Sequence, residues 1–457
     1  MPDQPLRTDP AGADPAARPL DRGVLERASG VLLAQAAGDA LGVPYEFAEP
    51  PGADELPVMR GGGLGPYAPG EWSDDTQMSV VVARVAARGG GLRSEAELDE
   101  VAAGFEAWRA GGASDVGTQT AAVLAGAGSA AHRDAGGPAA RLRAAAAQLH
   151  AATGRTAGNG ALMRTGVVGL VALDDRAATA AAARAVAELT HPDPLAGDSC
   201  VLWSEAVRLA VVAARLDVHA GLDLLPPGRR DAWRAWLDDA ASPHPAADLR
   251  ANGFTVTALQ AAWHAITRSV PPLPEGVEVP GHVHLPLALA AAVRIGGDTD
   301  TVAAVAGALL GARYGAGAVP DGWAWAVHGW PGLAGRRLGA LGRATAQGGP
   351  AEPGEPEQQV CPLCGTREPW SARYAGHVCA WCARWATDAA GRPVRLFNAS
   401  LTGGFTAQYP DGTTASAEVL AGTVWVDGRP LRAGEARFGG TVVQLPAGEA
   451  PGAVVVP

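Results

Sequence analysis

The stretch Gly297-Asp298-Thr299-Asp300-Thr301 stands directly before a long apolar segment that predicts a helix. A second acidic stretch, Ser73-Asp74-Asp75-Thr76, precedes another apolar segment much earlier in the chain. Each stretch therefore places carboxylates and hydroxyls at the start of a helix. Oxygen ligands of this kind are those that Mg²⁺ and Mn²⁺ prefer. If both stretches face one pocket, their carboxylates would repel one another and take up protons unless cations neutralised them. The alternative is that both are ordinary helix caps, a position that Ser73 suits.

Helical patterns fill most of the chain before residue 343. Abundant alanine and only 5% aromatic residues favour close-packed helices over a β-sandwich or barrel. No convincing strand alternation occurs before about residue 390. The sequence therefore predicts an all-α, multi-helix domain. The predicted helices span 24–41, 74–88, 95–110, 117–127, 138–149, 162–171, 176–190, 198–216, 230–240, 255–267, 285–294 and 301–314.

Composition changes divide the chain into five predicted parts. Residues 1–22, rich in Pro, Asp and Ala, predict a disordered leader, and the helical domain spans 23–343. A linker rich in Pro and Gly follows at 344–359, because such a run cannot form a packed element. A cysteine-containing module at 360–390 and a small β region at 391–457 complete the chain. Hairpin signals such as Asp427-Gly428 indicate that the last region is β.

Four of the five cysteines form two CxxC pairs, Cys361 with Cys364 and Cys379 with Cys382. This spacing is typical of one tetrahedral, structural Zn²⁺ in a zinc-ribbon-like module. A closed four-thiolate site has no open coordination position, so we expect it to fold the module rather than to catalyse a reaction. Cys200 lies in an apolar helical segment and is predicted to be a core residue.

The formal net charge of −11 argues against a general nucleic-acid or membrane-surface binder, which needs a cationic face. No apolar run has the length of a transmembrane helix, and the N-terminus lacks the pattern of a secretory signal. CxxC pairs also fit a reducing compartment better than a disulfide framework does. We therefore expect a cytoplasmic protein.

Four segments in this order resemble the ADP-ribosylglycohydrolases, the group that includes the dinitrogenase-reductase-activating glycohydrolase. They are Gly38-Asp39-Ala40-Leu41-Gly42, Trp72-Ser73-Asp74-Asp75-Thr76-Gln77-Met78, Gly158-Asn159-Gly160-Ala161-Leu162-Met163-Arg164 and Gly296-Gly297-Asp298-Thr299-Asp300-Thr301. The resemblance covers residues 23–343. It implies an all-α fold, a centre of two Mg²⁺ or Mn²⁺ ions, and a substrate in which ADP-ribose is attached to a protein side chain, usually arginine or serine.

The resemblance also implies roles for individual residues. The metal ligands would be Ser73, Asp74, Asp75, Asp298, Asp300 and Thr301. The family usually has threonine at the first position, and serine keeps the hydroxyl but loses a methyl group.

Three acids are candidates for handling protons in catalysis: Asp75, Glu46 and Asp115. Glu46 reads equally well as a solvated loop acid, and Asp115 as a helix cap. The candidates for substrate binding are Gly158, Asn159, Gly160, Arg164 and His191. The backbone N–H groups of Gly158-Asn159-Gly160 would cradle a diphosphate at a helix start. Arg164 reads equally well as a surface ion-pair residue, and His191 as a structural histidine.

Three functions are compatible with these features. The first is a metal-dependent hydrolase that releases ADP-ribose from a modified protein or a related conjugate. The second is a non-catalytic ADP-ribose-binding protein whose zinc module selects a protein partner. The third is a general two-metal phosphohydrolase, against which the absence of histidine-containing metal motifs weighs. The retained aspartates favour the first.

Overall fold

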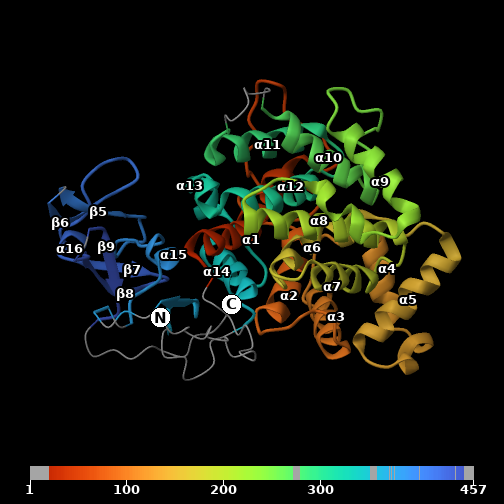
Figure 1. The fold of residues 1–457 in the computed structure, drawn as a ribbon, viewed down its shortest axis with the longest axis horizontal. Helices are drawn as coiled ribbons and strands as arrows, with labels where there is room; N and C mark the ends of the chain where they lie inside the picture. The colour runs from red at the N-terminus through yellow and green to blue at the C-terminus, as the bar shows by residue number, and fades with distance from the viewer. Residues whose placement is uncertain are drawn as a thin grey trace, which may run out of the picture.

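The computed structural model describes residues 20–270, 278–349 and 358–446, apart from 370, 372, 375, 401 and 438. A large helical domain and a smaller C-terminal part lie side by side (Figure 1). Almost all of the predicted leader and half of the predicted linker, residues 350–357, lie outside the described residues. Residues 344–346 of that linker are helical. The all-α prediction for the large domain is confirmed.

The helical domain contains fourteen α-helices among its described residues. They are α1 (Arg22–Gly42), α2 (Asp74–Ala86), α3 (Glu95–Ala110), α4 (Thr118–Ala127), α5 (Pro138–Thr153), α6 (Leu162–Thr165), α7 (Arg176–Glu188), α8 (Pro194–Ala213), α9 (Pro227–Ala240), α10 (Thr255–Arg268), α11 (Gly281–Ile295), α12 (Thr299–Tyr314), α13 (Asp321–Ala326) and α14 (Gly335–Ala346). Every predicted helix has a counterpart. The predicted helix at 162–171 is broken, however, because only its first turn is α-helical and Gly166–Leu170 is a 3-10 helix. Helices α13 and α14 were not predicted.

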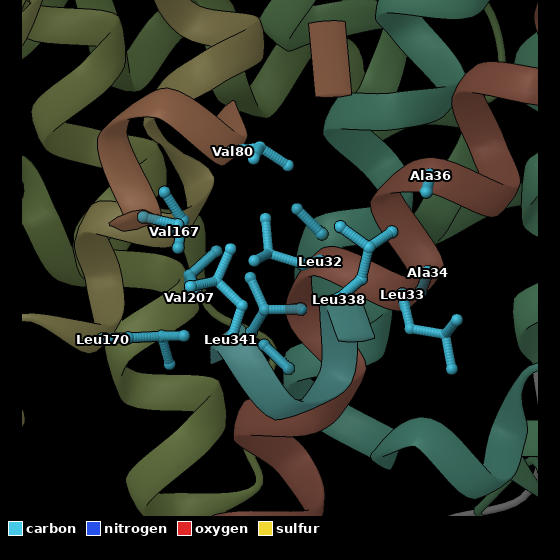
Figure 2. Close-up of a cluster of buried hydrophobic side chains, with 14 of the residues drawn as sticks. Leu32, Leu33, Ala34, Ala36, Val80, Val167, Leu170, Val207, Leu338 and Leu341 are labelled. Carbon is cyan, nitrogen blue, oxygen red and sulfur yellow. The ribbon is translucent and has the colours of Figure 1, made fainter. Parts of the chain in front are cut away.

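Helix α1 lies at the centre of the domain. Its Asp21 side chain caps the first turn by accepting a hydrogen bond from the N–H of Val24. Leu32 and Leu33 are fully buried, and Figure 2 shows them among side chains of α2, α8, α14 and the Gly166–Leu170 turn. Because α1 is apolar on all sides, it is buried all round rather than on one face.

A seam of small residues brings α1 against α12. A Cβ atom added to Gly30 would lie 2.2 Å from the carbonyl oxygen of Gly311, and one added to Gly38 would lie 2.1 Å from that of Ala303. A Cβ atom added to Gly42 would lie 2.3 Å from the Cα of Asp300. The two helix backbones can therefore approach this closely only because these positions carry no side chain. This approach places the C-terminal end of α1 against the N-terminal end of α12.

The C-terminal part is built from short antiparallel pairs and two short helices. Its elements are β3 (Gln358–Val360), β4 (Arg367–Pro369), α15 (Ala380–Ala383), β5 (Arg395–Ser400), β6 (Gly403–Gln408), α16 (Ala417–Leu420), β7 (Thr423–Val426), β8 (Arg429–Glu435) and β9 (Thr441–Gln444). Strand β3 pairs with β4, β5 pairs with β6, and β7, β8 and β9 form one sheet. The turn between β7 and β8 is Asp427-Gly428, both with positive φ, as the hairpin signal predicts.

Two pairs of short strands lie before residue 390, where no strand was expected. One is β3 with β4, and the other is β1 (His328–Gly329) with β2 (Leu333–Ala334). Both pairs are only two or three residues long, which is too short for an alternating pattern to be visible. None of the described helices is long and apolar enough to cross a membrane.

We predict that Gly38→Ala and Gly311→Ala destabilise the protein. Overpacking costs about 1–3 kcal/mol, and the gain in helix propensity offsets at most about 1 kcal/mol of this. Because the clash is with rigid backbone, we expect a net fall in the free energy of unfolding, measured with denaturant. Gly322→Ala in α13 is the control, since an added Cβ there meets nothing within 4 Å. Equal stability of all three variants would contradict the seam.

Candidate active site and metal centre

The two acidic stretches meet at one cavity of about 400 Å³. Carboxylate oxygens of Asp39, Asp75 and Asp300 lie within 4.8 Å of one another. Oxygens of Glu46, Asp115 and Asp300 form a second group of the same kind. Asp300 therefore belongs to both groups. Of the predicted metal ligands, Asp74, Asp298, Asp300 and Thr301 line the cavity, and Ser73 and Asp75 lie buried beside it.

Asp39 holds the start of α2 in place. Its Oδ1 accepts a hydrogen bond from the backbone N–H of Ser73 at 2.7 Å, and its Oδ2 accepts one from the backbone N–H of Thr76 at 3.0 Å. Asp39 on α1 thus does the capping that was expected of the Ser73 side chain, which makes no cap hydrogen bond. The Ser73 hydroxyl instead lies 2.7 Å from Asp39, 3.2 Å from Asp75 and 3.1 Å from Asp300. It is therefore positioned among the predicted metal ligands.

The donor set fits a pair of hard divalent cations. Asp75 Oδ1 is buried and has no hydrogen-bond partner, which is costly unless a cation fills that role. The described residues that line the cavity include no arginine, and the chain has no lysine. Carboxylate and hydroxyl oxygens are ligands for Mg²⁺ or Mn²⁺ rather than for a softer metal.

Burial and mutual repulsion make these carboxyl groups hard to ionise. Burial raises the pKa of Asp39 to about 6. Burial, reinforced by the neighbouring acids, raises the pKa values of Asp74, Asp75 and Asp300 well above their usual range. Bound divalent cations would reverse this repulsion and keep the groups ionised.

Glu46 and Asp115 form a pair of acids beside the cluster. Both are half-buried and line the cavity. Burial, together with the charge of Asp115, raises the pKa of Glu46 to about 9, and oxygens of the two carboxyl groups lie within 4.8 Å of one another. Burial also raises the pKa of Asp115. Because Glu46 is half-buried in the cavity wall, it is not a solvated loop acid. Asp115 is not a plain helix cap, since α4 begins only at Thr118.

The Gly158-Asn159-Gly160 segment lines the cavity, but its backbone is partly committed. The N–H of Asn159 donates to the carbonyl of Gly253 at 3.1 Å, and that of Gly158 donates to the Gln119 side chain at 3.4 Å. The segment opens a single 3-10 turn rather than a long helix. Of the backbone N–H groups predicted to cradle a diphosphate, those of Gly158 and Asn159 are therefore already engaged. The Asn159 side-chain amide instead donates to Asp298 Oδ2 at 2.8 Å, which fixes that carboxylate.

Arg164 does not reach the cavity, so its predicted contact with substrate is not made, and it is not a surface residue either. Its side chain is fully buried and lies over the ring of Phe105 at 4.6 Å. Its Nη2 donates to Thr190 Oγ1 at 2.7 Å, and the same oxygen lies 2.7 Å from His191 Nδ1. Thr190 therefore links Arg164 to His191 through its hydroxyl group.

His191 does line the cavity, and its ring packs against Gly158 and Gly160. Burial lowers its pKa well below the usual range, so the ring is neutral. Its Nε2 is the nitrogen nearer the two glycines. His191 therefore presents a neutral imidazole nitrogen at the cavity wall, and Arg164 orients the ring through Thr190.

Sequence reasoning gave no role to Asp39, Gln119 or Asn252. Asn252 accepts a hydrogen bond from the Asp298 N–H at 2.9 Å. Asp39 carried a signal, because it is the one charged residue in the apolar second half of α1. Gln119 and Asn252 carried none, since their roles depend on contacts with distant segments.

The four cysteines of the CxxC pairs form a second candidate metal site. Their sulfur atoms all lie within 4.8 Å of one another, and all four side chains are buried and unbridged by disulfides. The Cys364 and Cys379 sulfurs are 3.6 Å apart. Tetrahedral Zn²⁺ with Zn–S bonds of about 2.3 Å requires a separation of roughly 3.7 Å, so the geometry fits zinc. Cys200 is a core residue, as predicted.

Comparison with known proteins decides the family. The model of the ADP-ribosylglycohydrolase family matches residues 20–350. The chain belongs to the ADP-ribosylglycohydrolase family. This match includes every element around the acidic cavity and ends before the first cysteine pair.

Similar members of the family come from several bacteria. The chain is 28% identical to the ADP-ribosylarginine hydrolase Tri1 of Pseudomonas putida (strain GB-1), over 71% of this chain and 84% of that protein. It is 27% identical to the ADP-ribosyl-[dinitrogen reductase] glycohydrolase of Rhodospirillum rubrum, over 66% of this chain and 90% of that protein. A solved structure titled "ADP-ribosylglycohydrolase-related protein complex" has 24% identity and a TM-score of 0.50, over 71% of this chain and 99% of that one. It supports the fold.

We predict that Mg²⁺ or Mn²⁺ stabilises this ADP-ribosylglycohydrolase strongly at pH 8 and little at pH 5. The pKa of Asp39 is raised from 3.8 to about 6 in the folded, metal-free protein. The contribution of Asp39 to the free energy of unfolding is therefore fully present below pH 3.8 and is lost as the pH rises through about 6. Cations offset this loss, whereas protons compete with them at low pH. The measurement is the thermal unfolding midpoint with and without metal, after EDTA treatment. A metal-induced shift that is the same at pH 5 and pH 8 would contradict the assignment.

Proposed function

We propose that this protein hydrolyses the glycosidic bond that joins ADP-ribose to a protein side chain or a related conjugate. The observation that carries the proposal is the convergence of two distant acidic stretches on one cavity, with Asp300 common to both carboxylate groups. Family membership supports ADP-ribose removal as the reaction. The relatives named ADP-ribosylarginine hydrolase favour arginine over serine as the modified side chain.

The proposed metal ligands are Ser73, Asp74, Asp75, Asp298, Asp300 and Thr301, and they would hold two Mg²⁺ or Mn²⁺ ions. When bound, such ions orient the ribose hydroxyls and lower the pKa of a bound water. Asp39 has a different role in this proposal. Because both of its oxygens accept hydrogen bonds from the start of α2, it fixes Ser73 and Asp75 in place.

Glu46 and Asp115 are the proposed proton-handling pair. Burial raises the pKa of Glu46, which favours its protonated carboxyl group as the proton donor to the leaving group. Asp115 lies beside Glu46 and has a buried oxygen without a hydrogen-bond partner, Oδ2, which can receive a proton from the attacking water. Asp75 lies deeper, at 1% exposure, so it suits ligation better than proton exchange.

His191 and the Gly158–Gly160 segment are the proposed substrate contacts. The Nε2 atom of the neutral His191 ring lies beside two glycines whose missing side chains leave room for a diphosphate or ribose oxygen. Arg164 acts as a positioning residue for His191. A cytoplasmic location and a protein partner for the C-terminal part remain predictions.

We predict that Asp300→Asn lowers the rate of ADP-ribose release at least about 100-fold, because it removes a proposed metal ligand that lies between the Asp75 and Glu46 carboxyl groups. The assay measures free ADP-ribose from ADP-ribosyl-arginine and ADP-ribosyl-serine proteins, with and without EDTA. Asp231→Asn on the exposed face of α9 is the matched control. Full activity of Asp300→Asn would remove this residue from the metal site. Tight ADP-ribose binding without turnover by the wild-type, metal-loaded protein would support the non-catalytic alternative.

A further inference from the structure

Each sulfur of the four-cysteine site has a hydrogen-bond partner. Cys361 Sγ accepts from the backbone N–H of Cys379 at 3.3 Å, and Cys379 Sγ accepts from that of Cys382 at 3.4 Å. Cys364 Sγ lies 3.1 Å from the hydroxyl of Thr366. These three partners belong to the C-terminal part itself. The partner of Cys382 Sγ does not.

The partner of Cys382 is Arg336, which lies on α14 of the helical domain. Its Nη1 donates to Cys382 Sγ at 3.3 Å, and its Nε donates to Asp427 Oδ1 at 2.9 Å. Arg336 is only 5% exposed. Burial opposes its charge, but Asp427 and the cysteine sulfurs outweigh this effect and raise its pKa. A permanently charged guanidinium is thus held against the cysteine cluster.

Arg343, two turns further along the same face of α14, supports a second sulfur indirectly. Its Nε donates to Thr366 Oγ1 at 3.3 Å, and its Nη2 donates to Glu368 at 2.8 Å. Because the Thr366 oxygen accepts from arginine, its own proton is available to Cys364 Sγ. Arg343 is 4% exposed, so this contact is also sealed from water.

The two parts are in direct contact around these arginines. The indole N–H of Trp381 donates to the carbonyl of Arg336 at 2.9 Å. A Cβ atom added to Gly339 would lie 2.1 Å from the Trp381 ring. Trp381 stands between Cys379 and Cys382, so the cysteine loop itself packs on α14.

Charge explains why α14 matters for the metal. A Zn²⁺ ion with four thiolates carries a net charge of −2, and burying that charge is costly without positive or hydrogen-bonding neighbours. We propose that α14 supplies part of the outer shell of the zinc site through Arg336 and Arg343, so that zinc binding and docking of the C-terminal part are one coupled equilibrium. Coupling of this kind is reciprocal. Zinc loss weakens the docking, and undocking weakens zinc binding.

The test compares Arg336→Leu with Arg337→Leu in the full chain. Arg337 is the matched control, because it approaches the same Asp427 at 3.4 Å but is 41% exposed and its contact is with Asp427 rather than with a sulfur. Zinc affinity is measured by competition with a chromophoric chelator. Loss of an outer-shell partner typically costs 10–100-fold in metal affinity, so we expect about that loss for Arg336→Leu and less than about 3-fold for Arg337→Leu.

Two further readouts separate this role from a general packing defect. In the Co²⁺-substituted protein, Arg336→Leu is expected to shift the sulfur-to-metal charge-transfer band and to speed alkylation of the cysteines. Arg336→Lys, which keeps the charge but loses the planar fork, is expected to lie between wild type and Arg336→Leu. Wild-type zinc affinity in both Arg336 variants, or equal losses for Arg336→Leu and Arg337→Leu, would overturn the proposal. None of these readouts depends on ADP-ribose hydrolysis.

Discussion

The close approach of α1 to α12 is the constraint on which the rest of the structure depends. Glycines at 30, 38 and 42 let the two backbones come within van der Waals contact of one another. This contact sets Asp39 and Asp300 side by side, although they are far apart in sequence. Asp39 then fixes the start of α2, which brings Ser73 and Asp75 to the same place. A helix-packing property of small residues therefore creates the acidic cavity.

The cavity concentrates acidic side chains in buried positions, where most proteins avoid negative charge. Seven carboxylates surround or line it: Asp39, Glu46, Asp74, Asp75, Asp115, Asp298 and Asp300. The raised pKa values of Glu46, Asp74, Asp75 and Asp300 express the cost of that arrangement. Such a cost is acceptable only where a function uses it, and divalent cations turn it into binding energy. The C-terminal cysteine site solves a comparable problem of buried negative charge with arginines from α14.

Much of this could be predicted from the sequence, for physical reasons. Long apolar helices and acidic residues at helix starts are local patterns, so the helical class and the two stretches around Asp75 and Asp300 were readable. The CxxC pairs were readable because metal-ligand spacing is also local. The roles of Arg164 and Asp39 could not be predicted, because both depend on contacts with distant segments. Arg164 orients His191 through Thr190, and Asp39 holds the start of α2. For the same reason, the sequence could not show that Gly253 and Gln119 accept the N–H groups of Asn159 and Gly158.

The central claim is that the acidic cavity holds two divalent cations close to one another. The most direct measurement is the electron paramagnetic resonance spectrum of the Mn²⁺-loaded protein, with stoichiometry from calorimetry. Because proposed ligands from both acidic stretches face one cavity, the account predicts two Mn²⁺ ions per chain and an exchange-coupled signal. A single equivalent of Mn²⁺ with an isolated six-line spectrum, or no Mn²⁺ binding at neutral pH, would contradict it.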